Sequence, residues 1–259
     1  MRRPVSSLLA VLLLAALLLA GCSSGTSDDD ETELTVFAAS SLTAAFTERI
    51  GPAFEAGRDG VTVTFNFAAS DTLAEQIRSE GTADVFASAS ATWMDAVQDD
   101  PGVTGRIDFA TNRLVIVTPA DNPAGIASIE DLADGAVQLV LAAEGVPVGD
   151  YAREALDKAG IADEAEANVV SNEEDNASVV AKIAVGEGDA GIVYESDISA
   201  AAGNDVAAVE IPDDVNVVAT YPVAVIAGGS DEELASEFVT YLTGPDGQAA
   251  LEEYGFMPV

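Results

Sequence analysis

From residue 33 onward, short apolar runs alternate with segments of helical periodicity, and this alternation constrains the fold more than any other feature of the sequence. Regular alternation of strand and helix is typical of an α/β fold built on mainly parallel sheets. The apolar runs predict strands over residues 34–39, 61–67, 84–89, 114–117, 137–143, 169–170, 190–194 and 221–227.

Amphipathic helices are expected between these strands. One carries Leu42, Phe46, Ile50 and Phe54 at steps of four, and Pro52 is expected to kink or end it. The other helices are expected over residues 71–80, 93–97 and 149–159, from residue 176, and from residue 230 onward in two pieces. Their expected caps and stops are Gly81, Ser128 with Asp131, Gly160, and Ser230 with Glu233.

One unit recurs along the chain: a buried strand, a short loop of small residues and then a helix. The helices of these units start near Ser41, Ser70, Val148 and Asn176. In open α/β sheets ligands bind at the carboxyl ends of the strands, where helix N-termini present unpaired N–H groups and the positive end of the dipole. Several such ends that converge on one point would suit a small anion.

The loops offer hydrogen-bond donors without charge. Ser41 and Ser70 bring hydroxyls, Val148 stands among small residues that leave backbone N–H groups accessible, and Tyr194 ends a strand with a phenol. A fully deprotonated dianion needs donors only, whereas a protonated oxyanion such as phosphate also needs an acceptor. Each piece also has a structural explanation, because a serine at a helix start is often an N-cap and a tyrosine at a strand end is often core.

Composition excludes several kinds of function. The chain has no His and a single Cys, Cys22, which rules out Ser-His-Asp or Cys-His catalysis, a Cys/His zinc site and an intrachain disulfide. Lys and Arg total 10 against 45 Asp and Glu, so the formal net charge is −35. Binding to nucleic acid or to anionic lipid through a basic patch is therefore not expected. With 45 acidic residues, some pairs of neighbouring carboxylates are expected by chance, so such pairs do not indicate a hydrolase.

The N-terminus has the pattern of an export signal. Arg2 and Arg3 precede an apolar run over residues 8–20, which is shorter than the ~20 residues of a membrane-spanning helix. Residues 19–22, Leu-Ala-Gly-Cys, resemble the lipobox of bacterial lipoproteins, which implies cleavage before Cys22 and a lipid on its sulfur. The alternative is an ordinary secretory signal. We predict a signal peptide over 1–21 and a flexible, acidic linker over 22–32, in which a calcium site is a poor fit.

Several segments together resemble one known family. They are Thr35–Leu42, Ser70–Ile77, Ala83–Ala89, Trp93–Asp95, Val146–Ala152, Gly191–Tyr194, Tyr221–Val225 and Tyr254–Phe256. In this order they are similar to the molybdate-binding periplasmic proteins of ABC transporters, from about residue 33 to the C-terminus. The resemblance implies a two-lobed periplasmic-binding-protein-like fold of type II, with lobe 1 over 33–111 plus 222–259 and lobe 2 over 112–221.

The resemblance also implies a ligand and its contacts. Molybdate or tungstate would lie between the lobes, bound by Ser41 and Ser70 through hydroxyl and N–H groups, by Val148 and Asn176 through N–H groups and by Tyr194 through its phenol. The protein would be a monomer outside the cytoplasm, anchored to the cell membrane only by its N-terminal lipid. It would deliver the anion to an ABC permease, without a cofactor and without enzymatic activity.

Three positions depart from the family pattern or leave a choice. Ser40 precedes Ser41, so either hydroxyl could face the ligand. Asn176 replaces an apolar residue and could add a side-chain donor. Asp71 follows Ser70 directly, and its carboxylate is expected to point to solvent because it would repel an anion.

Alternative functions remain open on the sequence alone. A receptor for sulfate, thiosulfate or another small oxyanion would use the same donors. A secreted carboxylate-based hydrolase and an adhesion or scaffold domain with a vestigial cleft are alternatives from other classes.

Overall fold

The computed structural model describes residues 32–200 and 205–259. The predicted signal peptide, Cys22 and the predicted linker up to residue 31 lie outside the described residues. The strands are β1 (Thr32–Ala39), β2 (Val61–Ala68), β3 (Val85–Ala87), β4 (Val103–Pro119), β5 (Leu139–Ala142), β6 (Val169–Glu173), β7 (Ala190–Tyr194), β8 (Val206–Glu210) and β9 (Val218–Ile226).

The helices cover most of the chain between these strands. They are η1 (Ser40–Leu42), α1 (Thr43–Ala45), η2 (Phe46–Ile50), α2 (Gly51–Ala56), α3 (Ser70–Glu80), α4 (Ala91–Asp99), η3 (Ile129–Ala133), α5 (Pro147–Lys158), α6 (Ala162–Ala167), α7 (Asn176–Ala184), α8 (Glu195–Ala200), α9 (Glu232–Thr243) and α10 (Pro245–Glu253). The predicted α/β class is confirmed.

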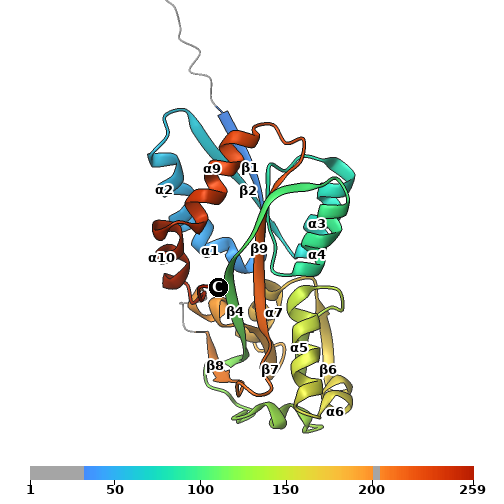
Figure 1. Cartoon of the computed structure of the whole chain (residues 1–259). Coiled ribbons are helices and arrows are strands. Elements are labelled where there is room, and N and C mark those ends of the chain that lie inside the picture. The colour runs from blue at the N-terminus through green and yellow to red at the C-terminus, as the bar shows by residue number, and fades with distance from the viewer. Residues whose placement is uncertain (1–31, 201–204) are drawn as a thin grey trace, which may run out of the picture. The chain divides into compact units, whose positions relative to one another are not determined.

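The strands form one hydrogen-bonded path, β2-β1-β3-β9-β4-β7-β5-β6, with β8 paired to β4. The long strand β4 divides it. Residues Val103–Arg113 of β4 pair with β9, and residues Leu114–Pro119 pair with β7 and β8. We call β2, β1, β3 and β9 with the first part of β4 the first sheet. The second part of β4 with β8, β7, β5 and β6 is the second sheet (Figure 1).

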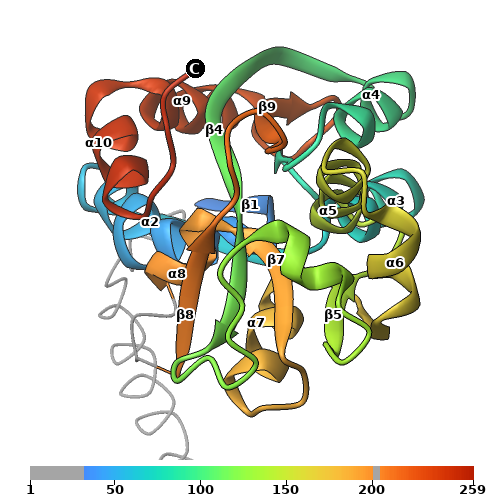
Figure 2. The same cartoon turned by 90° about the horizontal axis from the view of Figure 1, so that it is seen from below.

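Parallel pairing is found at the outer part of each sheet. Strand β1 pairs in parallel with β2 and β3, and β5 pairs in parallel with β6 and β7. In the first sheet the chain passes from β1 outward to β2 and then back across β1 to β3. In the second sheet it passes from β5 outward to β6 and then back across β5 to β7. Because parallel crossovers are right-handed, the two connecting helices must cover opposite faces. Helices α2 and α3 cover opposite faces of the first sheet in this way, and α5 and α7 those of the second (Figures 1 and 2).

In each sheet the two connections therefore leave the carboxyl edge toward opposite faces. The crevice between them at that edge is where α/β folds bind ligands. The carboxyl edges of the two sheets contact each other. Trp93 of α4 donates through Nε1 to the Gly145 carbonyl at 2.9 Å, and Ser40 hydrogen-bonds Asn176. The fold therefore places the loops that follow β1, β3, β5 and β6 at one junction.

The first helical segment, residues 40–56 from η1 to α2, does not end at Pro52. Leu42, Phe46, Ile50 and Phe54 are all fully buried, as predicted. Side chains spaced four residues apart do not stay on one face of an ordinary α-helix, because that helix has 3.6 residues per turn. The wide π-helical turn η2 corrects this drift and keeps all four side chains inward. Pro52 lies at the start of α2 and does not end the helix, which runs on to Ala56.

Other local predictions differ from the structure in detail. The strand predicted at 114–117 is only the end of β4, and α6, α8 and β8 were not predicted. The cap of α9 is Asp231, which accepts from Leu234 N, rather than Ser230. Ser230 instead donates to the buried carboxylate of Asp84 at 2.8 Å. The capping box of Ser128 and Asp131 is confirmed.

The predicted lobe boundaries at 111/112 and 221/222 fall inside β4 and β9, and they stay a prediction. Among the described residues, no helix is both long enough and apolar enough to cross a membrane.

Candidate functional site

The helix starts predicted from the sequence are confirmed. Ser41 lies in η1 after β1, Ser70 is the first residue of α3 after β2, Val148 follows Pro147 in α5 after β5, and Asn176 is the first residue of α7 after β6. First-turn N–H groups have no acceptor within their own helix. The junction of the two sheets thus receives main-chain donors and the positive ends of helix dipoles from both sides.

Ser41 contacts a residue that the sequence reasoning did not single out. Its Oγ lies 2.9 Å from the phenol oxygen of Tyr221, a fully buried residue of β9. Burial raises the pKa of Tyr221, so the phenol keeps its proton. With Tyr221 as the donor, the hydroxyl hydrogen of Ser41 is free to bind an anion. Tyr221 stands in one of the segments that carry the family resemblance, and this was the available signal.

Tyr194 ends β7 with a hydroxyl that is buried and unpaired. The residue is 1% exposed, and its phenol oxygen has no hydrogen-bond partner among the described residues. Its ring lies against that of Tyr221, with 5.8 Å between centroids. Burial raises its pKa well above the usual value, so it remains a donor. An unpaired buried hydroxyl costs about 1–3 kcal/mol, which a ligand bearing an acceptor oxygen would recover.

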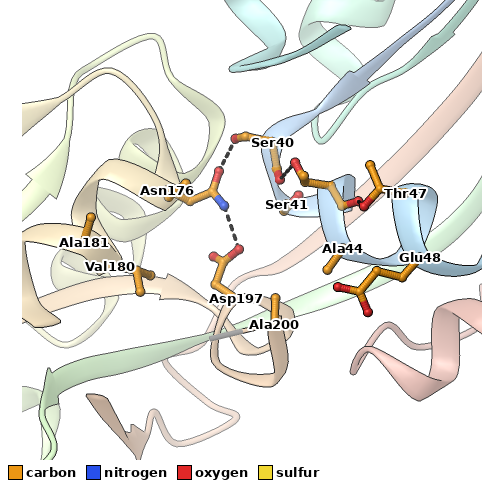
Figure 3. A pocket seen from close by; sticks show the side chains of 12 residues that line it. Ser40, Ser41, Ala44, Thr47, Glu48, Asn176, Val180, Ala181, Asp197 and Ala200 are labelled. Carbon is orange, nitrogen blue, oxygen red and sulfur yellow. Dashed lines mark hydrogen bonds between the residues drawn. The ribbon is translucent and has the colours of Figure 1, made fainter. Parts of the chain in front are cut away.

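The side chain of Asn176 is engaged at both ends (Figure 3). Its Oδ1 accepts from Ser40 Oγ, and its Nδ2 donates to Asp197 Oδ1 at 2.6 Å. Asp197 Oδ2 in turn accepts from the main-chain N–H of Tyr194 at 2.9 Å. The added side-chain donor that we considered for Asn176 is therefore directed at Asp197. Its main-chain N–H, at the start of α7, is not used by this network.

Ser41, Asn176 and Tyr194 are thus joined by contacts that run through Tyr221, Ser40 and Asp197. Ser41 and Asn176 also line a pocket of about 390 Å³ together with Asp197 and residues of the helices around it, namely Ser40, Thr43, Ala44, Thr47, Glu48, Ala177, Val180, Ala181 and Ala200. Figure 3 shows this pocket between the first helical segment and α7.

Ser70 and Val148 lie in a second group at the same junction. Both are 1% exposed. Ser70 Oγ accepts from Ala89 N at 2.9 Å, which leaves its own hydrogen available. Tyr151 of α5 donates to the Ala89 carbonyl at 3.4 Å, and its proximity contributes to the raised pKa of Tyr194. Within the described part of the chain, no hydrogen bond joins Ser70 or Val148 directly to the first group.

The expectation that Asp71 points to solvent holds only in part, because the residue is half-buried. Its Oδ1 is shielded from solvent and has no hydrogen-bond partner among the described residues. Burial raises the pKa of Asp71, and the neighbouring carboxylates of Glu75 and Asp150 raise it further. The side chain follows the turn at the start of α3, where the main-chain N–H groups of Asp71 and Thr72 attract it.

Basic side chains are used elsewhere. Without Arg2 and Arg3, 8 of the 10 basic residues are described, and each lies within 4.0 Å of a carboxylate. The described residues contain no group of three or more His, Cys, Asp or Glu side chains that could hold a metal ion. The junction offers neutral hydrogen-bond donors as its recognition chemistry.

Comparison with known proteins identifies the family to which the chain belongs. A family model for bacterial extracellular solute-binding proteins matches residues 34–257. The molybdate-binding protein ModA of Mycobacterium tuberculosis is 41% identical over 224 residues, which cover 86% of this chain and 84% of the relative.

Solved structures establish the fold but not the ligand. The periplasmic molybdate-binding protein of Azotobacter vinelandii matches with a TM-score of 0.75 at 19% identity, over 87% of this chain and 99% of that one. The sulfate-binding protein SubI of Mycobacterium tuberculosis matches with the same TM-score at 20% identity, over 88% and 87%. By family model and sequence identity, the chain belongs to the bacterial extracellular solute-binding proteins, among relatives that include the molybdate-binding proteins.

Proposed function

We propose that this protein captures molybdate or tungstate outside the cytoplasm and presents the anion to the permease of an ABC transporter. The anion would lie between the carboxyl edges of the two sheets. Ser41 and Ser70 would donate hydroxyl and N–H groups, Val148 and Asn176 main-chain N–H groups, and Tyr194 its phenol. The sequence identity to molybdate-binding relatives supports the choice of anion.

The observation that carries the proposal is the buried hydroxyl of Tyr194, which lies beside neutral donors and has no hydrogen-bond partner within residues 32–200 and 205–259. Hydrogen bonds to a charged group contribute about 1.5–3 kcal/mol each, so several of them hold a dianion without a counter-charge. A dianion that carries no proton accepts from all of these donors and donates to none. Larger polyphosphates fit less well, because they usually meet Lys or Arg.

The proposed mechanism is closure of one sheet's edge onto the other. In an open form the anion would bind to the donors of one sheet, and closure would add those of the other. The anion shifts this equilibrium only by its higher affinity for the closed form. Since sulfate is also an unprotonated dianion at neutral pH, selectivity for the larger molybdate would come from the size of the enclosed space.

Thermal unfolding with molybdate, tungstate, sulfate and phosphate at millimolar concentration tests the proposal. An anion at 100 times its Kd adds ~2.7 kcal/mol, which is roughly 5–10 °C in Tm for a domain of this size. We expect this shift with molybdate and tungstate only. Equal stabilisation by sulfate would show a general receptor for small oxyanions, and no shift with any of the four would remove the proposal.

We also propose that the protein is a monomer held at the membrane by a lipid on Cys22, with no cofactor and no enzymatic activity. The motif at residues 19–22 supports the anchor. Mass spectrometry of protein extracted from membranes should find diacylglycerol on the N-terminal cysteine. A Cys22→Ser variant that stays in the membrane fraction would contradict the anchor.

A further inference from the structure

Ser40 and Asn176 connect the two sheets directly at the candidate site. Ser40 follows β1 of the first sheet, and Asn176 begins α7 after β6 of the second. Their side-chain hydrogen bond joins positions 136 residues apart in the chain. Each residue stands beside a proposed ligand contact: Ser40 is next to Ser41, and Asn176 would bind through its own N–H.

The direction of this hydrogen bond is set by Asp197. Asp197 Oδ1 accepts a hydrogen bond from Asn176 Nδ2, which orients the Asn176 amide with Nδ2 toward Asp197. Oδ1 of Asn176 then faces Ser40, and Ser40 must be the donor. The hydroxyl hydrogen of Ser40 is therefore used within the protein, which leaves Ser41 as the serine that can donate to an anion.

The network extends to a third proposed contact. Asp197 Oδ2 also accepts a hydrogen bond from the main-chain N–H of Tyr194 at 2.9 Å. Asp197 and Asn176 are both buried, at 7% and 5% exposure, and both belong to the second sheet's side of the junction. Along this network, only the step from Ser40 to Asn176 passes from one sheet's side to the other, so movement of the edges apart would break this step and leave the others intact.

We infer that the hydrogen bond from Ser40 to Asn176 is a latch, which forms as the two edges meet and slows release of the bound anion although neither side chain touches it. This inference rests on the proposed function, because it takes an anion held between the edges as given. It assigns Ser40 and the Asn176 side chain a role in residence time rather than in recognition.

Stopped-flow fluorescence of Trp93 measures the latch. Trp93 is the single tryptophan of the chain, and its Nε1–H donates across the same junction to Gly145. The Ser40→Ala variant should release the anion roughly three- to tenfold faster, the range for one lost hydrogen bond, with an unchanged association rate constant.

The matched control is Thr47→Val. Thr47 lines the same pocket, but its hydroxyl donates within its own helix to the Thr43 carbonyl at 2.7 Å. This variant should release the anion at the wild-type rate. A second comparison uses Asn176→Ala, in whose background Ser40→Ala should have no further effect. A slower association, an equal effect of Thr47→Val, or an undiminished effect of Ser40→Ala in that background would each overturn the latch.

The experiments can refute the latch without refuting the proposed function, and they can refute the proposed function without refuting the latch. The kinetics are measured with whichever of the four anions stabilises the wild-type protein most, so a preference for sulfate would refute the molybdate proposal and still test the latch. If none of them binds, hydrogen exchange of the amides of residues 176–179 replaces the kinetics. Faster exchange in Ser40→Ala than in the wild type supports the latch, and equal exchange overturns it.

Discussion

At the scale of single residues, the buried tyrosines determine what the junction binds. Tyr194 and Tyr221 both have a pKa raised by burial, so both remain protonated donors throughout the physiological range. They differ in their partners, since Tyr221 contacts Ser41, whereas the Tyr194 hydroxyl has no hydrogen-bond partner in the described part of the chain. The unpaired hydroxyl lowers the stability of the unliganded protein in exchange for affinity.

Tyr194→Phe should therefore change stability and affinity in opposite directions. Removal of an unpaired buried hydroxyl should raise the free energy of unfolding of the unliganded protein by about 1 kcal/mol, while the loss of a bond to the anion should weaken affinity tenfold or more. Thermal unfolding and calorimetric titration measure the two effects. Tyr254→Phe is the control, because it removes a phenol that bonds Glu48 at the surface, 2.7 Å away. A loss of unliganded stability in Tyr194→Phe would contradict this account.

Asp197 makes stability depend on pH. Burial is the largest cause that raises its pKa from 3.8 to about 7. The folded protein thus holds a proton on Asp197 that the unfolded chain releases above its own pKa. The associated stability is complete below pH 3.8 and is lost as the pH rises through 7.

We expect the free energy of unfolding to fall by about 1 kcal/mol between pH 6 and 8 from this group. Urea unfolding across that range measures the fall. In Asp197→Asn the pH-dependent fall should disappear, whatever the absolute stability of the variant. An identical pH profile in the variant would assign the effect to other groups.

At the scale of elements, α5 begins in a position that only glycine allows. A Cβ at Gly149 would lie 2.5 Å from the Ala142 carbonyl oxygen, at the end of β5. The Ala143 carbonyl oxygen is also too close, and both oxygens are backbone atoms, so the start of α5 must move if a side chain is added. This start carries the N–H group of Val148 that the proposed site uses.

Gly149→Ala should lower the Tm despite the better helix propensity of alanine. The propensity gain is at most ~1 kcal/mol, whereas overpacking costs typically 1–3 kcal/mol or more. Anion affinity should fall as well, because α5 shifts. Gly135→Ala is the control, since a Cβ at Gly135 meets nothing within 4 Å and should change neither quantity. Unchanged Tm and affinity in Gly149→Ala would show that α5 adapts without cost.

Elements with regular patterns could be predicted, and those with interrupted patterns could not. The helix starts at Ser70, Val148 and Asn176 follow from small residues after apolar strands, and the structure confirms them. The first part of β4 was missed because its register shifts between Thr104 and Ile107 and again between Asp108 and Ala110. These irregularities break the alternation of period two by which a strand is recognised.

The partners of the candidate site lay beyond sequence reasoning for a different reason. Tyr221 and Asp197 act through contacts with residues of other elements, Ser41 on β1's side and Asn176 on α7. Nothing in the sequence near either residue specifies such a contact. Their place depends on how the two sheets meet, which no local pattern encodes.

At the scale of the whole molecule, charge opposes the proposed ligand. The formal net charge of −35 repels an anion that approaches through solvent. Salt screens this repulsion, with a Debye length of about 10 Å at 0.1 M. The association rate constant of molybdate should therefore rise with NaCl concentration between about 20 and 500 mM, and the dissociation rate should change little.

Stopped-flow fluorescence of Trp93 provides both rates. Potassium chloride at equal ionic strength is the control for specific effects of the cation and should give the same curve. An association rate that falls with salt would indicate attraction by a local positive field, against the pairing of every described basic side chain with a carboxylate.

The two sheets are connected by β4, which runs through both, and by the chain that leads from β8 into β9, and β9 is hydrogen-bonded to β4. Relative rotation of the sheets in the proposed closure would therefore twist a two-stranded ribbon instead of swinging on a slack loop. The restoring torque of such a ribbon increases with the angle through which it is twisted. Once the permease has taken the anion, elastic recoil would reopen the protein and prepare it for the next one.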